Sequence, residues 1–176
     1  MITYIEDKSP KYPPRTYANA SADATIAFAF DFGTPGELLT KDAVEKQGKL
    51  YIQVFPSFVN SLKIKNVATF VSDAKVKTIN IAGNSLPIII KNNFTQLYCD
   101  TFVHEFMKLL INHPIFDCNI QIIRSGGQSG FDEAGIKAAI KLGIPALIHC
   151  PKGFKFINEH GETICDEVLF KRRFEI

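Results

Sequence analysis

The segment from Ile120 to Cys150, IQIIRSGGQSGFDEAGIKAAIKLGIPALIHC, constrains the fold more than any other part of the chain. A β-branched run comes first, a glycine-rich turn follows, and a helical pattern of apolar residues begins at Phe131. A second apolar run ends at Cys150. The segment therefore predicts strand, turn, helix and strand in succession, which is half of a nucleotide-binding α/β unit.

The glycine-rich turn is expected to bind an anion through its backbone. At the amino end of a helix, unpaired N–H groups and the helix dipole favour negative charge, and glycines let a phosphate approach closely. The turn matches neither GxGxxG nor GxxxxGK[ST], and Gly126, Gly127 and Gly130 are also what a tight strand-to-helix turn needs. The polar residues Gln128 and Ser129 favour binding, because a purely structural turn does not need them.

Composition favours a single domain, 1–176, without an electrostatic case for binding duplex nucleic acid. The 176 residues are 46% hydrophobic and 22% charged, which suits one sizeable core. The net charge of +2 comes from 20 basic and 18 acidic residues spread along the chain. The densest basic cluster, Lys171 to Arg173, is interpreted as a solvated or locally paired patch.

Spacing of cysteines and histidines gives no reason to expect a metal site. The four cysteines contain no CxxC pair, and the four histidines show no HExxH or zinc-finger spacing. The N-terminal MITYIEDKSP does not resemble a signal peptide, and no apolar run approaches membrane-spanning length. These observations indicate a reduced, cytoplasmic protein with no membrane partner.

The rest of the chain alternates between strand and helix patterns. Thr34, Pro35 and Glu37 have the pattern of an N-cap, a first helical residue and a capping-box partner, so a helix is expected there, ending at Gly48. A core-facing helix is expected over Thr95 to Asn112. Strands are expected at Ile2 to Ile5, Asp23 to Phe30, Leu50 to Phe55 and Thr78 to Gly83.

Two segments depart from this alternation. Ser9 to Ser21 is rich in proline, so it is predicted to form a long ordered loop and no continuous helix. Pro56 to Lys77 mixes β-branched residues with lysines and fits either a short helix or an excursion beside the sheet. The alternation as a whole predicts a Rossmann-like, doubly wound α/β fold, with a mostly parallel sheet and helices on both faces.

The segment SGGQSGFDEAGIKAAIKLGIP, followed by the CPKG letters at 150–153, resembles the molybdenum cofactor carrier family. That family belongs to a wider Rossmann-like group with the SLOG ligand sensors and the Lonely Guy phosphoribohydrolases, and its pattern is SGGQTGxDxAA…GIP…CPKG. The resemblance is specific, because it spans the turn, the helix and a second loop. It implies a nucleotide-binding crevice at the carboxyl ends of the strands.

A second resemblance lies near the N-terminus, in the opposite order along the chain. The segment YPPRTYANASADAT at 12–25 is similar to the family's YxxRTxxNxxDSDGT, and the similarity continues to INIAG at 79–83. In the family these pieces follow the SGGQTG half, whereas here they precede it. The chain therefore resembles a circularly permuted member, and a packed sheet tolerates such a rotation when the old termini are close.

These segments supply the remaining candidate ligand-binding residues. Arg15 offers a bidentate fork for phosphate or carboxylate, while Thr16 and Asn19 of the RTxxN-like segment are weaker candidates that also suit loop organisation. Lys152 of the CPKG loop fits either a second electrostatic contact or an ordinary exposed lysine. Asp23 is expected to border the same crevice. Pro35 stands where the family has glycine, which argues against phosphate contact at that turn.

Asp132 and Glu133 are candidates for catalysis only if the protein is an enzyme. A carboxylate in the first helical turn complements the dipole, and Glu133 with Lys137 has i,i+4 spacing, so structural roles are equally open. Aligning the paired glycines with the Lonely Guy pattern PGGxGTxxE places Glu133 at that motif's glutamate. However, Ser129 and Gly130 replace the motif's Gly-Thr, which weakens the enzymatic interpretation.

Three functions stay open from the sequence. The first is a carrier, sensor or sequestering protein for a nucleotide or a nucleotide-derived anionic molecule, for which no cofactor is required. The second is hydrolysis of a nucleotide N-glycosidic bond, with Asp132 or Glu133 activating water. The third, molybdenum cofactor binding, is implied only by the family's name. Relatives in this group often dimerise through helices, so a homo-oligomer is also compatible with the resemblance.

Overall fold

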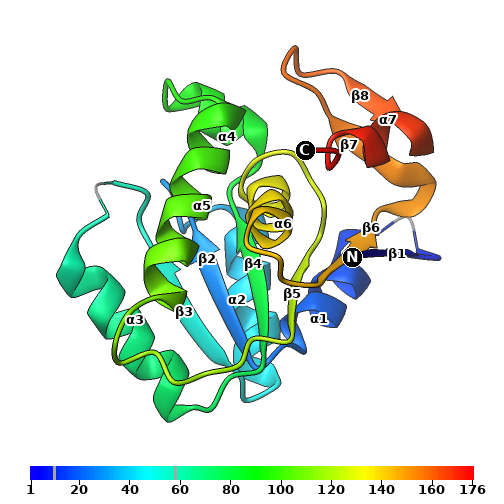
Figure 1. The fold of residues 1–176 in the computed structure, drawn as a ribbon. Helices are drawn as coiled ribbons and strands as arrows, with labels where there is room; N and C mark the ends of the chain where they lie inside the picture. The colour runs from blue at the N-terminus through cyan, green and yellow to red at the C-terminus, as the bar shows by residue number, and fades with distance from the viewer. Residues whose placement is uncertain (10, 58) are drawn as a thin grey trace.

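A six-stranded parallel sheet forms the centre of the protein in a computed structural model that describes residues 1–9, 11–57 and 59–176 (Figure 1). The strand order across the sheet is β1-β6-β5-β4-β2-β3, and every neighbouring pair runs parallel. The strands are β1 (Ile2–Glu6), β2 (Ala24–Phe28), β3 (Leu50–Val54), β4 (Thr78–Gly83), β5 (Ile122–Ser125) and β6 (Ala146–Cys150). The predicted α/β class with a parallel sheet is therefore confirmed.

Helices alternate with the strands and cover both faces of the sheet (Figure 1). One face carries α1 (Tyr12–Ala20) and α2 (Pro35–Lys46). The other carries α3 (Ser61–Asp73), α5 (Gln96–Ile111) and α6 (Phe131–Lys141). The short α4 (Leu86–Lys91) follows β4. After β6, a 3₁₀ turn η1 (Lys152–Phe154), the antiparallel pair β7 (Lys155–Ile157) and β8 (Thr163–Cys165), and α7 (Glu167–Arg172) complete the chain.

The two faces of the sheet differ in chemistry. Toward α5 and α6 the strands present aliphatic and aromatic side chains such as Ile26, Phe28 and Ile81, which are fully buried in the main core. Toward α1 and α2 they present polar ones, and Asn80 donates from Nδ2 to Thr25 Oγ1 at 3.2 Å. Parallel strands covered on both sides usually read as continuous apolar runs. A layer of polar side chains inside the fold is therefore unusual, and it makes the α1–α2 side the place to look for a binding site.

The order of the strands places a topological switch point between β2 and β4. From β2 the chain moves outward to β3, whereas from β4 it proceeds in the opposite direction to β5 and β6. Helices following the two strands consequently lie on opposite faces, and their loops separate at the carboxyl edge. Segments from β2, β4, β5 and β6 can meet there.

The first and last thirds of the chain are joined at one side of the sheet. The edge strand β1 pairs in parallel with β6, with Ile2 opposite Ala146 and Glu6 opposite Cys150. The N-terminal strand lies beside the C-terminal β7–β8–α7 segment in Figure 1. The sheet thus continues across a large separation in sequence.

The prediction that Ser9 to Ser21 forms no helix is wrong. Helix α1 occupies Tyr12–Ala20, with its two prolines in the first turn. Prolines are tolerated there because the first N–H groups of a helix have no intrahelical partner, and the fixed φ of proline suits the helix. The prolines therefore start this helix, and Arg15, Thr16 and Asn19 come to lie on its buried face.

Other boundaries follow the sequence closely. Thr34 caps α2, accepting from the Glu37 N–H at 3.4 Å, and the chain turns at Gly48 with φ +63°. The segment left open at Pro56 to Lys77 contains a helix of 13 residues, α3, capped by Asn60. No helix in the described residues is long and apolar enough to span a membrane.

Candidate functional site

A cleft of about 490 Å³ opens at the carboxyl edge of the sheet. Four neighbouring strands contribute to its walls through the segments that follow them, and α1 closes one side. We call it the carboxyl-edge cleft; its lining residues are Tyr12, Arg15, Thr34, Pro35, Gly36, Glu37, Gly83, Asn84, Ser85, Ile88, Gln128, Asp132, Pro151, Lys155 and Ile157. Its position at the switch point is where open α/β sheets bind ligands.

A smaller cavity of about 20 Å³ lies against the polar face of the sheet and shares four lining residues with the cleft. It is large enough for about one water molecule. We call it the inner cavity; it is lined by Tyr12, Arg15, Thr16, Asn19, Thr40, Asn80, Ala82, Gly83, Gly126 and Asp132. The structure thus brings Arg15, Thr16 and Asn19 of α1 together with the glycine-rich turn, as the sequence predicted.

Arg15 is the main positive charge at this site. Its side chain is buried, its guanidinium lies 5.0 Å from the centre of the Tyr12 ring, and it lines both the cleft and the inner cavity. A Cβ built on Gly126 would lie 3.5 Å from Arg15 Nε and 2.5 Å from Asp132 Oδ2. The missing side chain at Gly126 therefore lets an arginine and a carboxylate approach the backbone of the turn.

Asp132, the second residue of α6, faces this arginine. Burial raises its pKa from 3.8 to about 7, and the shift is opposed by Arg15 and by the backbone amides of Gln128, Gly126 and Gly83. Two amides assigned from sequence to a ligand anion thus lie against a carboxyl group of the protein. The Gly130 N–H is engaged as well, donating to Gln96 Oε1 at 2.7 Å. The turn offers fewer free amides to an anion than its sequence suggested.

Glu37 is a second acidic group in the wall of the cleft. It is 3% exposed, and its Oε2 has no hydrogen-bond partner in the described part of the protein. Burial raises its pKa from 4.5 to about 8; the negative charge of Asp132 adds to the rise, while Asn84 opposes it. Sequence reasoning assigned Glu37 only to a capping box. A buried acid without a partner at the end of a cleft is a signal that only the folded structure provides.

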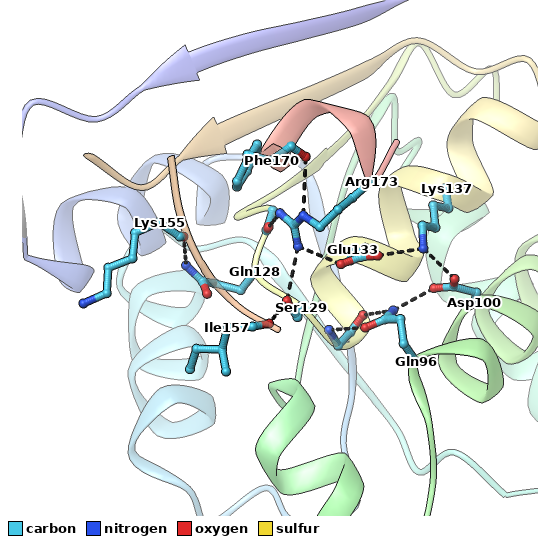
Figure 2. Close-up of polar contacts among 12 residues, drawn as sticks. Gln96, Asp100, Gln128, Ser129, Glu133, Lys137, Lys155, Ile157, Phe170 and Arg173 are labelled. Atoms are coloured by element: carbon cyan, nitrogen blue, oxygen red, sulfur yellow. Dashed lines mark hydrogen bonds and ion pairs between the residues drawn. The ribbon is translucent and has the colours of Figure 1, made fainter. Parts of the chain in front are cut away.

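Polar side chains of the glycine-rich turn are bound by the C-terminal segment (Figure 2). Ser129 donates its hydroxyl to the Ile157 carbonyl and accepts from Arg173 Nη1 at 3.2 Å. Gln128 donates from Nε2 to the Lys155 carbonyl at 3.1 Å. The Ser129 hydroxyl, predicted to contact a ligand, therefore has a structural partner on each side, whereas Gln128 still lines the cleft.

Glu133 lies in an ion-pair network on the opposite side of the turn (Figure 2). It is 4% exposed and pairs with Arg173 at 2.7 Å and with Lys137 at 2.6 Å. Lys137 also pairs with Asp100 at 2.7 Å. Glu133 does not line the carboxyl-edge cleft. This position differs from the one a catalytic glutamate would need and supports the i,i+4 structural interpretation instead.

Arg173 is the residue that the sequence interpretation undervalued. Its guanidinium lies 4.1 Å from the Phe156 ring centre and 4.5 Å from that of Phe170, and Nη2 donates to the Gly127 carbonyl at 2.8 Å. Arg173 is therefore paired inside the protein and is not solvated, in line with the locally paired alternative. Its position among phenylalanines near the C-terminus was the available signal, because arginine stacks well on aromatic rings.

Lys152 and Asp23 lie away from the carboxyl-edge cleft. Lys152 is exposed in η1 and is absent from the lining, in which Lys155 supplies the lysine. Asp23 precedes β2 and so lies at the amino edge of the sheet, where Oδ2 accepts from the Lys77 and Thr78 N–H groups at 3.1 and 3.0 Å. The expectation that Asp23 borders the crevice fails because a residue before a parallel strand lies at the edge opposite to residues after it.

Thr16 and Asn19 also have contacts within the protein. The Thr16 hydroxyl donates to the Tyr12 carbonyl at 3.4 Å, and Asn19 Oδ1 lies 3.0 Å from His149 Nδ1. Both line the inner cavity and neither lines the outer cleft. Of the site residues predicted from the sequence, Arg15, Gln128 and Asp132 line the outer cleft.

Comparison with known proteins adds no family assignment: no family model matches the chain, and no curated protein matches it significantly.

Proposed function

We propose that the protein binds a nucleotide or a nucleotide-derived anionic small molecule in the carboxyl-edge cleft, as a carrier, sensor or sequestering protein. The observation that carries this proposal is the convergence of Arg15, Asp132 and Gln128 on one cleft at the switch point of a parallel sheet. Arginine is the residue best suited to phosphate or carboxylate, and carboxyl groups suit sugar hydroxyls. The volume of about 490 Å³ falls in the range of small-molecule sites.

The resemblance to the molybdenum cofactor carrier and SLOG group supports the same proposal. Under it, the chain is a circularly permuted member in which β1 and β6 join the rearranged halves. Both family-like segments, the RTxxN-like helix and the SGGQSG turn, contribute to one site.

Ligand recovery and calorimetry test binding directly. The purified protein is heat-denatured, and the released material is analysed by mass spectrometry for nucleotides, pterin and metal. Titration of AMP, GMP, CMP and UMP into ligand-free protein then gives affinities. We expect Arg15→Ala to weaken binding roughly tenfold or more, because a charge-assisted hydrogen bond is lost. Absence of both a copurified ligand and any heat of binding would remove the proposal.

A second function, hydrolysis of a nucleotide N-glycosidic bond, is favoured by the two acidic groups. The pKa values of Asp132 and Glu37 are raised to about 7 and about 8, which brings both groups near neutral pH, where general acids and bases work best. Chromatographic detection of free base after incubation with nucleoside monophosphates tests it. Base release by the wild type that is lost in Asp132→Asn but kept in Glu45→Gln would establish hydrolysis. Unchanged nucleotide in every reaction would contradict hydrolysis and leave binding as the only proposed function.

A further inference from the structure

The two ends of the carboxyl-edge cleft lie at different strands of the sheet. Its walls come from segments that follow β6, β5, β4 and β2, which are consecutive neighbours in the sheet. Three inter-strand spacings of about 4.8 Å make this distance on the order of 14 Å. A nucleoside monophosphate laid across the sheet edge is of similar length, so its two ends would contact different strands.

The two ends of the cleft differ in charge: one has a lysine, and the other has a buried carboxyl group whose pKa is raised to about 8. Lys155, in the segment after β6, is the basic residue at one end, and Glu37, in the helix after β2, is the acidic residue at the other. Asp132 and Arg15 also line the cleft. A ligand with one anionic end is therefore bound more favourably in one orientation than in the reverse.

The Glu37 end is unsuited to phosphate. Pro35 has no N–H, the Glu37 N–H bonds to Thr34 Oγ1, and the Leu38 N–H donates to the Thr34 carbonyl at 3.0 Å. The amino end of α2 thus lacks most of the free donors that an anion requires, and a carboxyl group occupies its first turn. A phosphate placed here would meet the acidic group with little compensation.

The same end is suited to a hydrogen-bond donor. Glu37 Oε2 is buried and has no partner within the described residues, and a buried acceptor of this kind is costly unless something donates to it. The last torsion of a glutamate side chain is broad, so the carboxyl group can turn toward the cleft that Glu37 lines. Asn84, the neighbouring amide, donates from Nδ2 to the Asp31 carbonyl at 3.0 Å, and its Oδ1 accepts from the Phe30 and Asp31 N–H groups.

We infer that Glu37 determines specificity by accepting a hydrogen bond from the N–H edge of a nucleobase, while the phosphate of the same ligand lies at the Lys155 end of the cleft. The inference rests on the proposed function and adds the orientation and the class of group recognised. The ribose then lies between the two ends, beside Asp132, and Arg15 in the cleft wall adds a second positive charge for the phosphate.

Truncated ligands combined with substitutions at each end test this orientation. Affinities of AMP, GMP, adenosine and ribose 5-phosphate are measured by calorimetry for the wild type, Glu37→Met, Glu37→Gln and Lys155→Gln. Glu45→Gln, on the exposed side of the same helix, and Lys108→Gln, at an exposed position of α5, are charge-matched controls outside the cleft. Glu37→Met replaces a buried unpartnered group with an apolar side chain of similar size, and Glu37→Gln keeps the shape without a group that can ionise, so both variants are expected to fold.

We expect Glu37→Met to lower the affinities for AMP and for adenosine by a similar factor, roughly tenfold, and to leave the affinity for ribose 5-phosphate unchanged. Lys155→Gln should lower the affinities for AMP and ribose 5-phosphate but not the affinity for adenosine. Equal or tighter binding of AMP and GMP by both Glu37 variants would overturn the inference while leaving the proposed function intact. The reverse pattern, with adenosine sensitive to Lys155, would also overturn it. Failure of the wild type to bind any phosphorylated probe would instead remove the proposed function.

Discussion

Single residues around the glycine-rich turn divide into a ligand side and a support side. Asp132 and Glu133 are adjacent in sequence, yet Asp132 lines the cleft, whereas Glu133 joins Arg173 and Lys137 on the other side. Successive residues of a helix point in directions about 100° apart, so neighbours commonly serve different surroundings. The sequence could not decide which acid faces the cleft, because both fit the first turn of a helix equally well.

The support side predicts a stability effect for Glu133. Glu133→Gln removes the charge of a buried carboxylate between two partly buried cations, Arg173 and Lys137, and should lower the free energy of unfolding by about 2–4 kcal/mol. Urea denaturation measures this change, with Glu45→Gln as the control. Glu45 is exposed in an i,i+4 pair, so that variant should differ from wild type by less than about 0.5 kcal/mol. A Glu133→Gln protein as stable as its control would show that the network contributes little.

Among the secondary-structure elements, α7 supports the glycine-rich turn by packing against it. Its Phe170 is fully buried, and a Cβ on Gly127 would lie 2.8 Å from the Phe170 ring. Gly127 has φ +68°, so both its conformation and its surroundings require glycine. The helix thus packs directly on the turn that borders the cleft.

Phe170→Ala should therefore destabilise the protein by about 3–5 kcal/mol, through lost burial and the cavity left behind. Val168→Ala, in the same helix but 64% exposed, is the matched control and should have little effect. Thermal and urea denaturation report both variants. A small loss in Phe170→Ala, comparable to that of Val168→Ala, would mean that α7 is only loosely attached to the turn.

Elements with strong local signals were predictable, and those fixed by distant contacts were not. The strand Thr78–Gly83 and the cap at Thr34 follow from local pattern, and the structure matches them. Helix α1 was missed because prolines were taken as breakers when they occupy a first turn. The roles of Arg173 and Glu37 depend on contacts with segments far away in sequence, which no local pattern contains.

The whole molecule should become less stable as pH rises from about 5 to about 8. The pKa values of Asp132 and Glu37 are raised by burial above their unfolded values of 3.8 and 4.5, so the folded state holds more protons than the unfolded state in this range. The free energy of unfolding therefore falls with rising pH over this range. Urea denaturation at intervals between pH 5 and 8 measures the slope.

Glu37→Gln isolates one of these contributions. The variant should show a shallower decline and higher stability than wild type at pH 8, because no buried carboxyl has to ionise at that position. His149, whose pKa is lowered mainly by burial, acts in the opposite direction in both proteins and cancels in the comparison. Parallel pH profiles for the variant and wild type would contradict the raised pKa of Glu37.

Because of the polar layer beneath α1 and α2, local stability is expected to differ between the two faces of the sheet. In the described part of the chain, the apolar cluster beneath this helix pair is small, consisting of Ala20, Ala43 and Val44 with Tyr17 and Tyr51 beside it, whereas the opposite face contains the main core. Local opening should begin where apolar contacts are fewest, so amide hydrogens of α1 are expected to exchange with deuterium sooner than those of α6. A bound nucleotide that contacts Arg15 is expected to slow exchange in α1 first, because it would add contacts on the side of the fold where apolar packing is sparsest.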